Sequence, residues 1–292
     1  MHSVKRNILW NLLGNVLPLL VGLLLFPLII KAYGLERFGL LTLAWALVGY
    51  FGLFDLGLSR ALTQLVSESL ANKKNATDVA ELIKTGFGLM WALGFLGGFV
   101  LWFCTPWIVT GPLNINHSLQ QESILAFSIL AFSVPVVIHA SAMRGVLEAL
   151  HLFKSASLIR MVLGVGTFLA PYLASLHSHS LVGAIQALFA VRILVWGMYF
   201  FAVRQSRILD VVSQSFKLNW LKPLFSFGGW MTVTNIIGPL MTYMDRFVIA
   251  SILGASSVAY YVAPYEVVTK LLVIPVAISR SEERRVGKEC RL

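Results

Sequence analysis

Long apolar stretches separated by short polar segments dominate this chain. The eight stretches occupy residues 8–30, 38–58, 87–109, 124–142, 158–176, 181–203, 224–253 and 258–278. A helix needs about 20 apolar residues to cross a hydrocarbon core of about 30 Å, and most of the stretches reach that length. Only helices and closed barrels satisfy the backbone in lipid, and barrel strands would show short alternating runs. The pattern therefore predicts an all-α, polytopic transmembrane helical bundle with about eight spans.

The composition is too apolar for an ordinary soluble domain. Hydrophobic residues make up 58% of the chain and charged residues only 12%, whereas soluble domains average about 25% charged residues. The formal net charge of +10 would suit nucleic acid. However, the cations lie in short segments beside the apolar stretches, which favours membrane lipids as partners and no nucleic acid.

Signals for catalysis or for a bound cofactor are weak. Cys104 and Cys290 give neither a disulfide framework nor a metal-binding spacing. His177 and His179 have no carboxylate or third histidine nearby, so a solvated turn fits them better than a metal site. No glycine-rich loop with a Walker lysine occurs in the sequence. We therefore expect no metal, no cofactor and no enzymatic reaction.

The distribution of Lys and Arg between the polar segments predicts the orientation. Alternate segments hold thirteen cations, namely Lys5, Arg6, Arg60, Lys73, Lys74, Lys84, Arg144, Lys154, Arg160, Arg204, Arg207, Lys217 and Lys222. The other segments hold only Lys31 and Arg37. Because cytoplasmic loops carry the excess of Lys and Arg, we expect a multi-pass protein of the bacterial cytoplasmic (inner) membrane with a cytoplasmic N-terminus.

A weak internal repeat organises the chain. Shifting the sequence by 220 residues lays Asn15 on Asn235 and Gly34 on Gly254, at equivalent places in two pairs of spans. The shift preserves orientation, so the two halves would be related by an axis along the membrane normal. It predicts a six-helix lobe over 1–204 and the first two helices of a second lobe over 223–279.

Two further segments fall outside the spans. Residues 205–222 space apolar residues as a helix does, which favours a cytoplasmic interfacial linker helix, with a partner-binding helix as the alternative. Residues 62–83 show a similar mixed pattern. Residues 280–292 are similar to the translated read-through of a sequencing adapter, so we expect them to lie outside any fold and the natural protein to continue beyond Ser279.

Charged and polar residues within the spans are the candidates for function, because a charge at the bilayer centre costs about 2.5–3.5 kcal/mol or more. The candidates for substrate binding are Lys31, Arg192, Arg246 and Lys270, with Asn15 and Asn235; those for ion coupling are Asp245 and Glu266. The excess of cations favours an anionic substrate such as a phosphate or pyrophosphate headgroup. Glu266 and Lys270 are spaced for an intrahelical ion pair, so mutual neutralisation is the alternative to substrate contact.

Three stretches of the sequence resemble polysaccharide flippases of the O-antigen type, within the multidrug/oligosaccharidyl-lipid/polysaccharide exporter superfamily. They are Asn11–Asn15 running to Tyr33–Gly39, Phe54–Leu58, and Asp245–Ile249 followed by Leu253–Gly254 and Ala259–Tyr261. The resemblance implies two six-helix lobes. It also implies movement of an undecaprenyl-pyrophosphate-linked oligosaccharide between the leaflets of a bacterial inner membrane. A glycan polymerase and chain-length machinery would then be partners.

Two other functions stay open at this point. A cation-coupled multidrug exporter would share the architecture, but cationic drugs favour carboxylates in the cavity, whereas these spans favour cations. A membrane glycan polymerase or acyltransferase usually needs a sizeable outer loop with clustered polar residues. The predicted outer segments are short and nearly free of charge, which disfavours that enzyme.

Overall fold

The computed structural model describes residues 2–51, 54–72, 75–113, 115–206, 208 and 217–271, and within these the side chains of 2–15 and of several residues of the last two helices are left out. Over these ranges the chain is helical and contains no strand, which confirms the all-α prediction. The elements are α1 (His2–Tyr50), α2 (Leu58–Ala71), α3 (Ala76–Thr110), α4 (His117–Ala149), α5 (Phe153–Ser175), α6 (Leu181–Gln205), the short 3-10 turn η2 (Leu218–Trp220), α7 (Leu221–Leu253) and α8 (Ala255–Leu271).

The first element contains two helices that form a hairpin. Gly34 breaks α1 with φ 75° and ψ 167°, a conformation that L side chains rarely adopt. Gly254, between α7 and α8, has nearly the same angles, φ 81° and ψ 170°. These are the two glycines that the 220-residue shift aligns, so the two hairpins turn in the same way at equivalent positions.

Membrane-spanning character follows from length and apolar composition. Within the described residues, five helices are long and apolar enough to cross a membrane: Val16–Tyr50, α3, α4, α5 and α6. The first of them holds two of the predicted spans, because it folds back at Gly34. Large apolar side chains face outward from the bundle, for example Phe103 at 72% and Trp107 at 70% exposure. These features are those of a multi-pass membrane protein.

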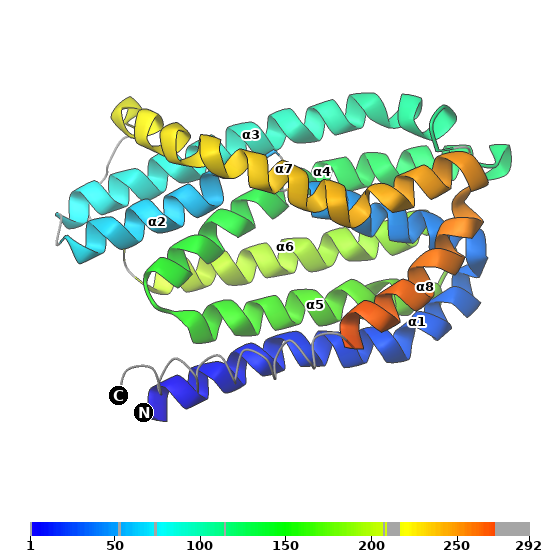
Figure 1. Ribbon diagram of the computed structural model, residues 1–292, viewed down its shortest axis with the longest axis horizontal. Coiled ribbons are helices and arrows are strands. Elements are labelled where there is room, and N and C mark those ends of the chain that lie inside the picture. The colour runs from blue at the N-terminus through cyan, green and yellow to red at the C-terminus, as the bar shows by residue number, and fades with distance from the viewer. Residues whose placement is uncertain are drawn as a thin grey trace, which may run out of the picture.

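The long helices lie roughly side by side along the longest dimension of the molecule (Figure 1). The hairpin of α7 and α8 packs against α1, and α7 also contacts α2. Close approaches depend on small residues: a Cβ built at Gly94 of α3 would lie 2.6 Å from Cα of Pro135 in α4. A Cβ built at Gly39 of α1 would lie 1.9 Å from the carbonyl oxygen of Ala255 in α8.

The helix of the predicted span 38–58 is shorter than the apolar stretch, because it ends at Tyr50. A turn follows, in which Leu56 and Gly57 both have positive φ. Asp55 holds the turn: its Oδ1 accepts from the backbone N–H of Gly57 at 2.8 Å, and its Oδ2 accepts from the Ser59 hydroxyl at 2.6 Å. Asp55 is buried at 6% exposure, so its role is to shape this turn rather than to reach toward water.

The mixed segment 62–83 does not form a single surface helix. It divides between α2 and the start of α3. Its apolar residues Leu62, Val66, Leu82 and Ile83 are fully buried in the main core, which accounts for their helical spacing. Half of 205–222 and all of 280–292 lie outside the described residues, so the linker, the lobe boundaries and the tail stay predictions.

Candidate functional site: an arginine-lined cavity

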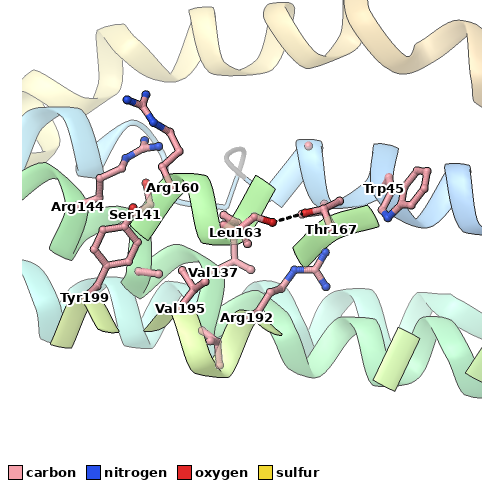
Figure 2. A pocket seen from close by; sticks show the side chains of 14 residues that line it. Trp45, Val137, Ser141, Arg144, Arg160, Leu163, Thr167, Arg192, Val195 and Tyr199 are labelled. Atoms are coloured by element: carbon pink, nitrogen blue, oxygen red, sulfur yellow. Dashed lines mark hydrogen bonds between the residues drawn. The ribbon is translucent and has the colours of Figure 1, made fainter. Parts of the chain in front are cut away.

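A cavity of about 460 Å³ lies among α1, α4, α5 and α6. Its lining consists of Trp45, Val48 and Gly49 from α1, Val136, Val137, Ala140, Ser141 and Arg144 from α4, Arg160, Leu163 and Thr167 from α5, and Arg192, Val195 and Tyr199 from α6. Figure 2 shows Arg144 and Arg160 toward one end of the cavity and Arg192 with Trp45 toward the other. The site thus combines an apolar wall with three guanidinium groups.

Helical periodicity brings the three arginines to one space. On α4 the lining residues Val137, Ala140, Ser141 and Arg144 recur at intervals of three and four, which places them on one face of that helix. The same intervals relate 160, 163 and 167 on α5 and 192, 195 and 199 on α6. The three faces converge, so the arginines are positioned by rigid helices rather than by loops.

The charge of the cavity is one-sided. No Asp or Glu is among the described residues that line it. Arg144 has Glu148 on its own helix at 3.8 Å, but both side chains are more than a third exposed, and such pairs contribute little. A guanidinium nitrogen of Arg160 lies 3.5 Å from the Ser157 hydroxyl. The lining therefore presents cations to any group that enters.

Arg192 is the most deeply placed cation of the cavity. It is only 7% exposed, and its Nη1 has no hydrogen-bond partner among the described residues. The indole Nε1–H of Trp45, in the same lining, is also buried and finds no acceptor in the described part of the chain. A buried donor without an acceptor costs free energy, more so when it is charged. A ligand with several oxygen acceptors and a negative charge would satisfy these donors.

Two hydroxyl groups add polar surface near the arginines. Thr167 donates its hydroxyl to the carbonyl oxygen of Leu163 at 2.8 Å, which leaves the threonine oxygen able to accept (Figure 2). Tyr199 lines the cavity and is 3% exposed. Planar guanidinium groups form paired hydrogen bonds with oxyanions, so this lining is chemically suited to hold one.

A second charged cluster joins α7 and α8. Arg246 is 2% exposed, and one of its terminal nitrogens lies 2.7 Å from Oε1 of Glu266. The guanidinium also lies over the rings of Tyr243 and Tyr265, at 5.2 and 5.7 Å from their centroids. Tyr261 donates its hydroxyl to Asp245. The two carboxylates predicted for ion coupling thus have different partners: among the described residues, Glu266 contacts the guanidinium of Arg246, and Asp245 accepts from the Tyr261 hydroxyl.

The structure separates the predicted substrate residues. Arg192 lines the cavity and Arg246 lies in the second cluster, whereas Lys31 is exposed on α1 and is not among the described residues of either group. The side chains of Asn15, Asn235 and Lys270 lie outside the described part of the structure.

Sequence reasoning missed Arg144 and Arg160, which it counted among the cations between spans. Both lie on helices, because α4 continues to Ala149 and α5 begins at Phe153. Helical spacing could have identified them, because each arginine lies three or four residues from other lining residues of its own helix.

The sequence is similar to proteins of polysaccharide biosynthesis. Residues 4–280 match the family described as "Polysaccharide biosynthesis protein". A relative from Shigella flexneri, named "Putative O-antigen transporter", is 33% identical over 279 residues, which cover 96% of this chain and 65% of the relative. The chain therefore spans just under two thirds of the length of that relative.

Solved structures share the fold. The inward-facing conformation of a multidrug resistance MATE family transporter of the MOP superfamily superposes with a TM-score of 0.71 at 13% identity, over 91% of this chain and 62% of that protein. A MOP superfamily transporter from Pyrococcus furiosus, whose description reports a binding pocket of reverse polarity, gives a TM-score of 0.60 at 14% identity, over 89% of this chain and 66% of that protein. At such identities the likeness concerns the fold alone.

Proposed function

This chain belongs to the polysaccharide biosynthesis protein family, and we propose that it moves an undecaprenyl-pyrophosphate-linked oligosaccharide, such as an O-antigen unit, across the bacterial inner membrane. The observation that supports the proposal is the cavity lined by Arg144, Arg160 and Arg192. The described lining of this cavity contains no carboxylate. Hydrocarbon cannot solvate a pyrophosphate, so its passage requires cationic donors at membrane depth.

The order of the arginines along the cavity suits stepwise entry of the headgroup. The side chain of Arg144 is 42% exposed, whereas Arg192 is 7% exposed. In the proposed orientation, with the N-terminus in the cytoplasm, Arg144 and Arg160 lie toward the cytoplasmic side and Arg192 lies deeper. The headgroup would first meet the more accessible cation and then reach the buried donors of Arg192 and Trp45. The polyprenyl tail would stay in lipid.

The same observation disfavours the alternative of a multidrug exporter for cationic drugs. A cationic drug in this cavity would face three arginines, and the described lining offers no carboxylate to pair with it. Like charges repel strongly in a medium of low polarity. We also propose that the protein acts by transport without catalysis, next to a glycan polymerase and chain-length machinery that use the exported units.

The test is complementation of a bacterial strain that lacks its own O-antigen transporter, with the full-length protein. Replacing Arg192 by Ala removes a buried charged donor, and such losses cost about 1.5–3 kcal/mol of binding, or about 10- to 150-fold in affinity. We expect Arg192→Ala and Arg160→Ala to reduce surface glycan strongly at normal protein abundance, with partial rescue by Arg192→Lys. Lys31→Ala, a cation outside the cavity, is the control and should export as wild type. Full export by both cavity variants would refute the proposal.

A further inference from the structure

The charged cluster between α7 and α8 lies directly behind the wall of the arginine-lined cavity. Gly49 lines the cavity, and a Cβ built on it would lie 2.4 Å from the ring of Tyr243. The guanidinium of Arg246 sits over that same ring. Tyr50, the residue after Gly49, contacts the rings of Tyr243 and Phe247. The ring of Tyr243 thus contacts both the cavity-lining backbone at Gly49 and the guanidinium of Arg246.

Glu266 neutralises Arg246 in the present arrangement. Their 2.7 Å contact is a charge-assisted hydrogen bond, whereas Asp245 accepts from the Tyr261 hydroxyl and from the backbone N–H of Arg246 at 2.8 Å. The Nε of Arg246 is buried without a hydrogen-bond partner among the described residues. Arg246 thus has one donor, Nε, without a described acceptor, and a second, terminal nitrogen that donates to Glu266.

The two partners differ in access to water. The side chain of Arg246 is 3% exposed, and that of Glu266 is 24% exposed. A proton can therefore reach Glu266 while the guanidinium stays buried. Protonation would turn the ion pair into a buried cation facing a neutral acid, and a buried cation without a counter-charge is strongly unfavourable. An oxyanion from the neighbouring cavity would restore the balance of charge.

We propose that Glu266 is a proton-controlled counter-ion that masks Arg246, and that protonation of Glu266 exposes Arg246 as a second binding site for the pyrophosphate headgroup. The proposal rests on the proposed function, because its ligand is the same headgroup. One proton from water binds the Glu266 carboxylate, the contact with Arg246 breaks, and the guanidinium donates to phosphate oxygens instead. Proton uptake and anion binding are then coupled, and each favours the other by the same factor.

Other titratable groups also face this pair and must be kept constant in a test. Tyr243 and Asp245 come from α7, Tyr261 and Tyr265 from α8, and Tyr50 from α1. A Glu266→Gln substitution keeps the size and shape of the side chain, removes its charge, and leaves these groups in place. Comparison with wild type at the same pH also cancels the titration of the ligand itself.

The experiment measures binding of inorganic pyrophosphate to the purified chain in detergent by calorimetry at pH 5.5 and pH 8.0. We expect Glu266→Gln to bind about tenfold or more tightly than wild type at pH 8.0, and the difference between the two proteins to shrink as the pH is lowered to 5.5. Adding Arg246→Ala to Glu266→Gln should abolish the gain. Glu122→Gln, which alters a similar Arg–Glu pair with Arg37 away from the cavity, is the matched control and should bind as wild type.

A second measurement does not depend on the folding of the Gln variant. Calorimetry of wild type at pH 7 in buffers of different ionisation enthalpy should show about one more proton taken up per bound pyrophosphate than Arg246→Ala takes up. Equal affinity of Glu266→Gln and wild type at pH 8.0, or equal proton uptake by wild type and Arg246→Ala, would overturn the masking of Arg246. If these are equal while Arg192→Ala still weakens binding, only this inference fails. If neither wild type nor Glu266→Gln binds pyrophosphate, the proposed function fails as well.

Discussion

The contact between Gly39 and Ala255 gives a sharp test of how the two hairpins pack. Gly39 lies on α1, five residues after the turn at Gly34, and Ala255 is the first residue of α8. A Cβ at position 39 would lie 1.9 Å from the Ala255 carbonyl oxygen and 2.6 Å from its carbonyl carbon. These are backbone atoms, so no side-chain rotation can relieve the clash.

The size of the effect follows from two opposing contributions. To reach ordinary contact, the Ala255 oxygen must withdraw from 1.9 Å to at least 3.4 Å, a shift of about 1.5 Å for the start of α8. Overpacking of this kind costs about 1–3 kcal/mol, and a backbone clash belongs at the upper end of that range. Replacing Gly by Ala inside a helix returns about 0.5–1 kcal/mol. We expect Gly39→Ala to lower the free energy of unfolding by about 2 kcal/mol.

The assay is thermal unfolding of the purified chain in detergent. A loss of about 2 kcal/mol corresponds to a fall in Tm of about 4–8 °C for a protein of this size. Gly197→Ala is the matched control, because Gly197 lies inside α6 and a Cβ there meets nothing within 4 Å. The control retains only the gain in helix propensity, so its Tm should rise by about 1–4 °C.

The opposite signs of these two identical substitutions are the decisive result. Both replace a helical glycine by alanine, so they share the change in backbone entropy and differ only in what the new methyl group meets. If Gly39→Ala raised the Tm as Gly197→Ala does, the close approach of α1 and α8 would not exist in the protein. If both lowered it, helix propensity would not be the term that dominates at Gly197.

Two further ion pairs give predictions of their own. Glu122→Ala removes the acceptor of the Leu181 backbone N–H at 2.5 Å and the partner of Arg37 at 3.0 Å, so we expect unfolding in detergent to become easier by about 1–2 kcal/mol; an unchanged Tm would refute this role at the start of α6. Lys217→Met leaves Glu81, whose side chain is 6% exposed, without its partner at 2.7 Å, a loss of about 1–3 kcal/mol. The Tm in detergent should fall accordingly, and an unchanged Tm would contradict the reasoning.

The sequence predicts the helices well because the bilayer restricts the possibilities. Lipid excludes an open backbone, so each long apolar stretch has to be helical, and glycines at the two turns align under a single shift of 220 residues. The boundaries were less predictable. Within the apolar stretch 38–58 the helix ends at Tyr50, and Asp55 accepts the hydrogen bonds of the turn that follows. Hydrophobicity alone does not predict such a local turn.

The site was only partly predictable for a different reason. Arg192 stood out because it interrupts an apolar stretch, and the structure places it in the cavity. Arg144 and Arg160 lie where apolar stretches give way to polar segments, so charge counting assigned them to loops. The partners of Arg246 and Glu81 come from α8 and from the segment before η2, and a single sequence does not reveal contacts between residues so far apart.

The first hairpin makes the same kind of turn as the second with apolar residues at the positions of the charged cluster. The 220-residue shift lays Phe26 on Arg246, Ala46 on Glu266 and Trp45 on Tyr265. In the first hairpin, Phe26 and Trp45 pack ring to ring at 5.9 Å, where the second hairpin has Arg246 over Tyr265 at 5.7 Å. The same turn and the same crossing are thus stabilised once by apolar packing and once around an ion pair. Because a buried ion pair rarely stabilises more than apolar residues of similar volume, the charges in the second hairpin need a reason other than stability, and the proposed exchange of Arg246 between Glu266 and a phosphate oxygen would provide one.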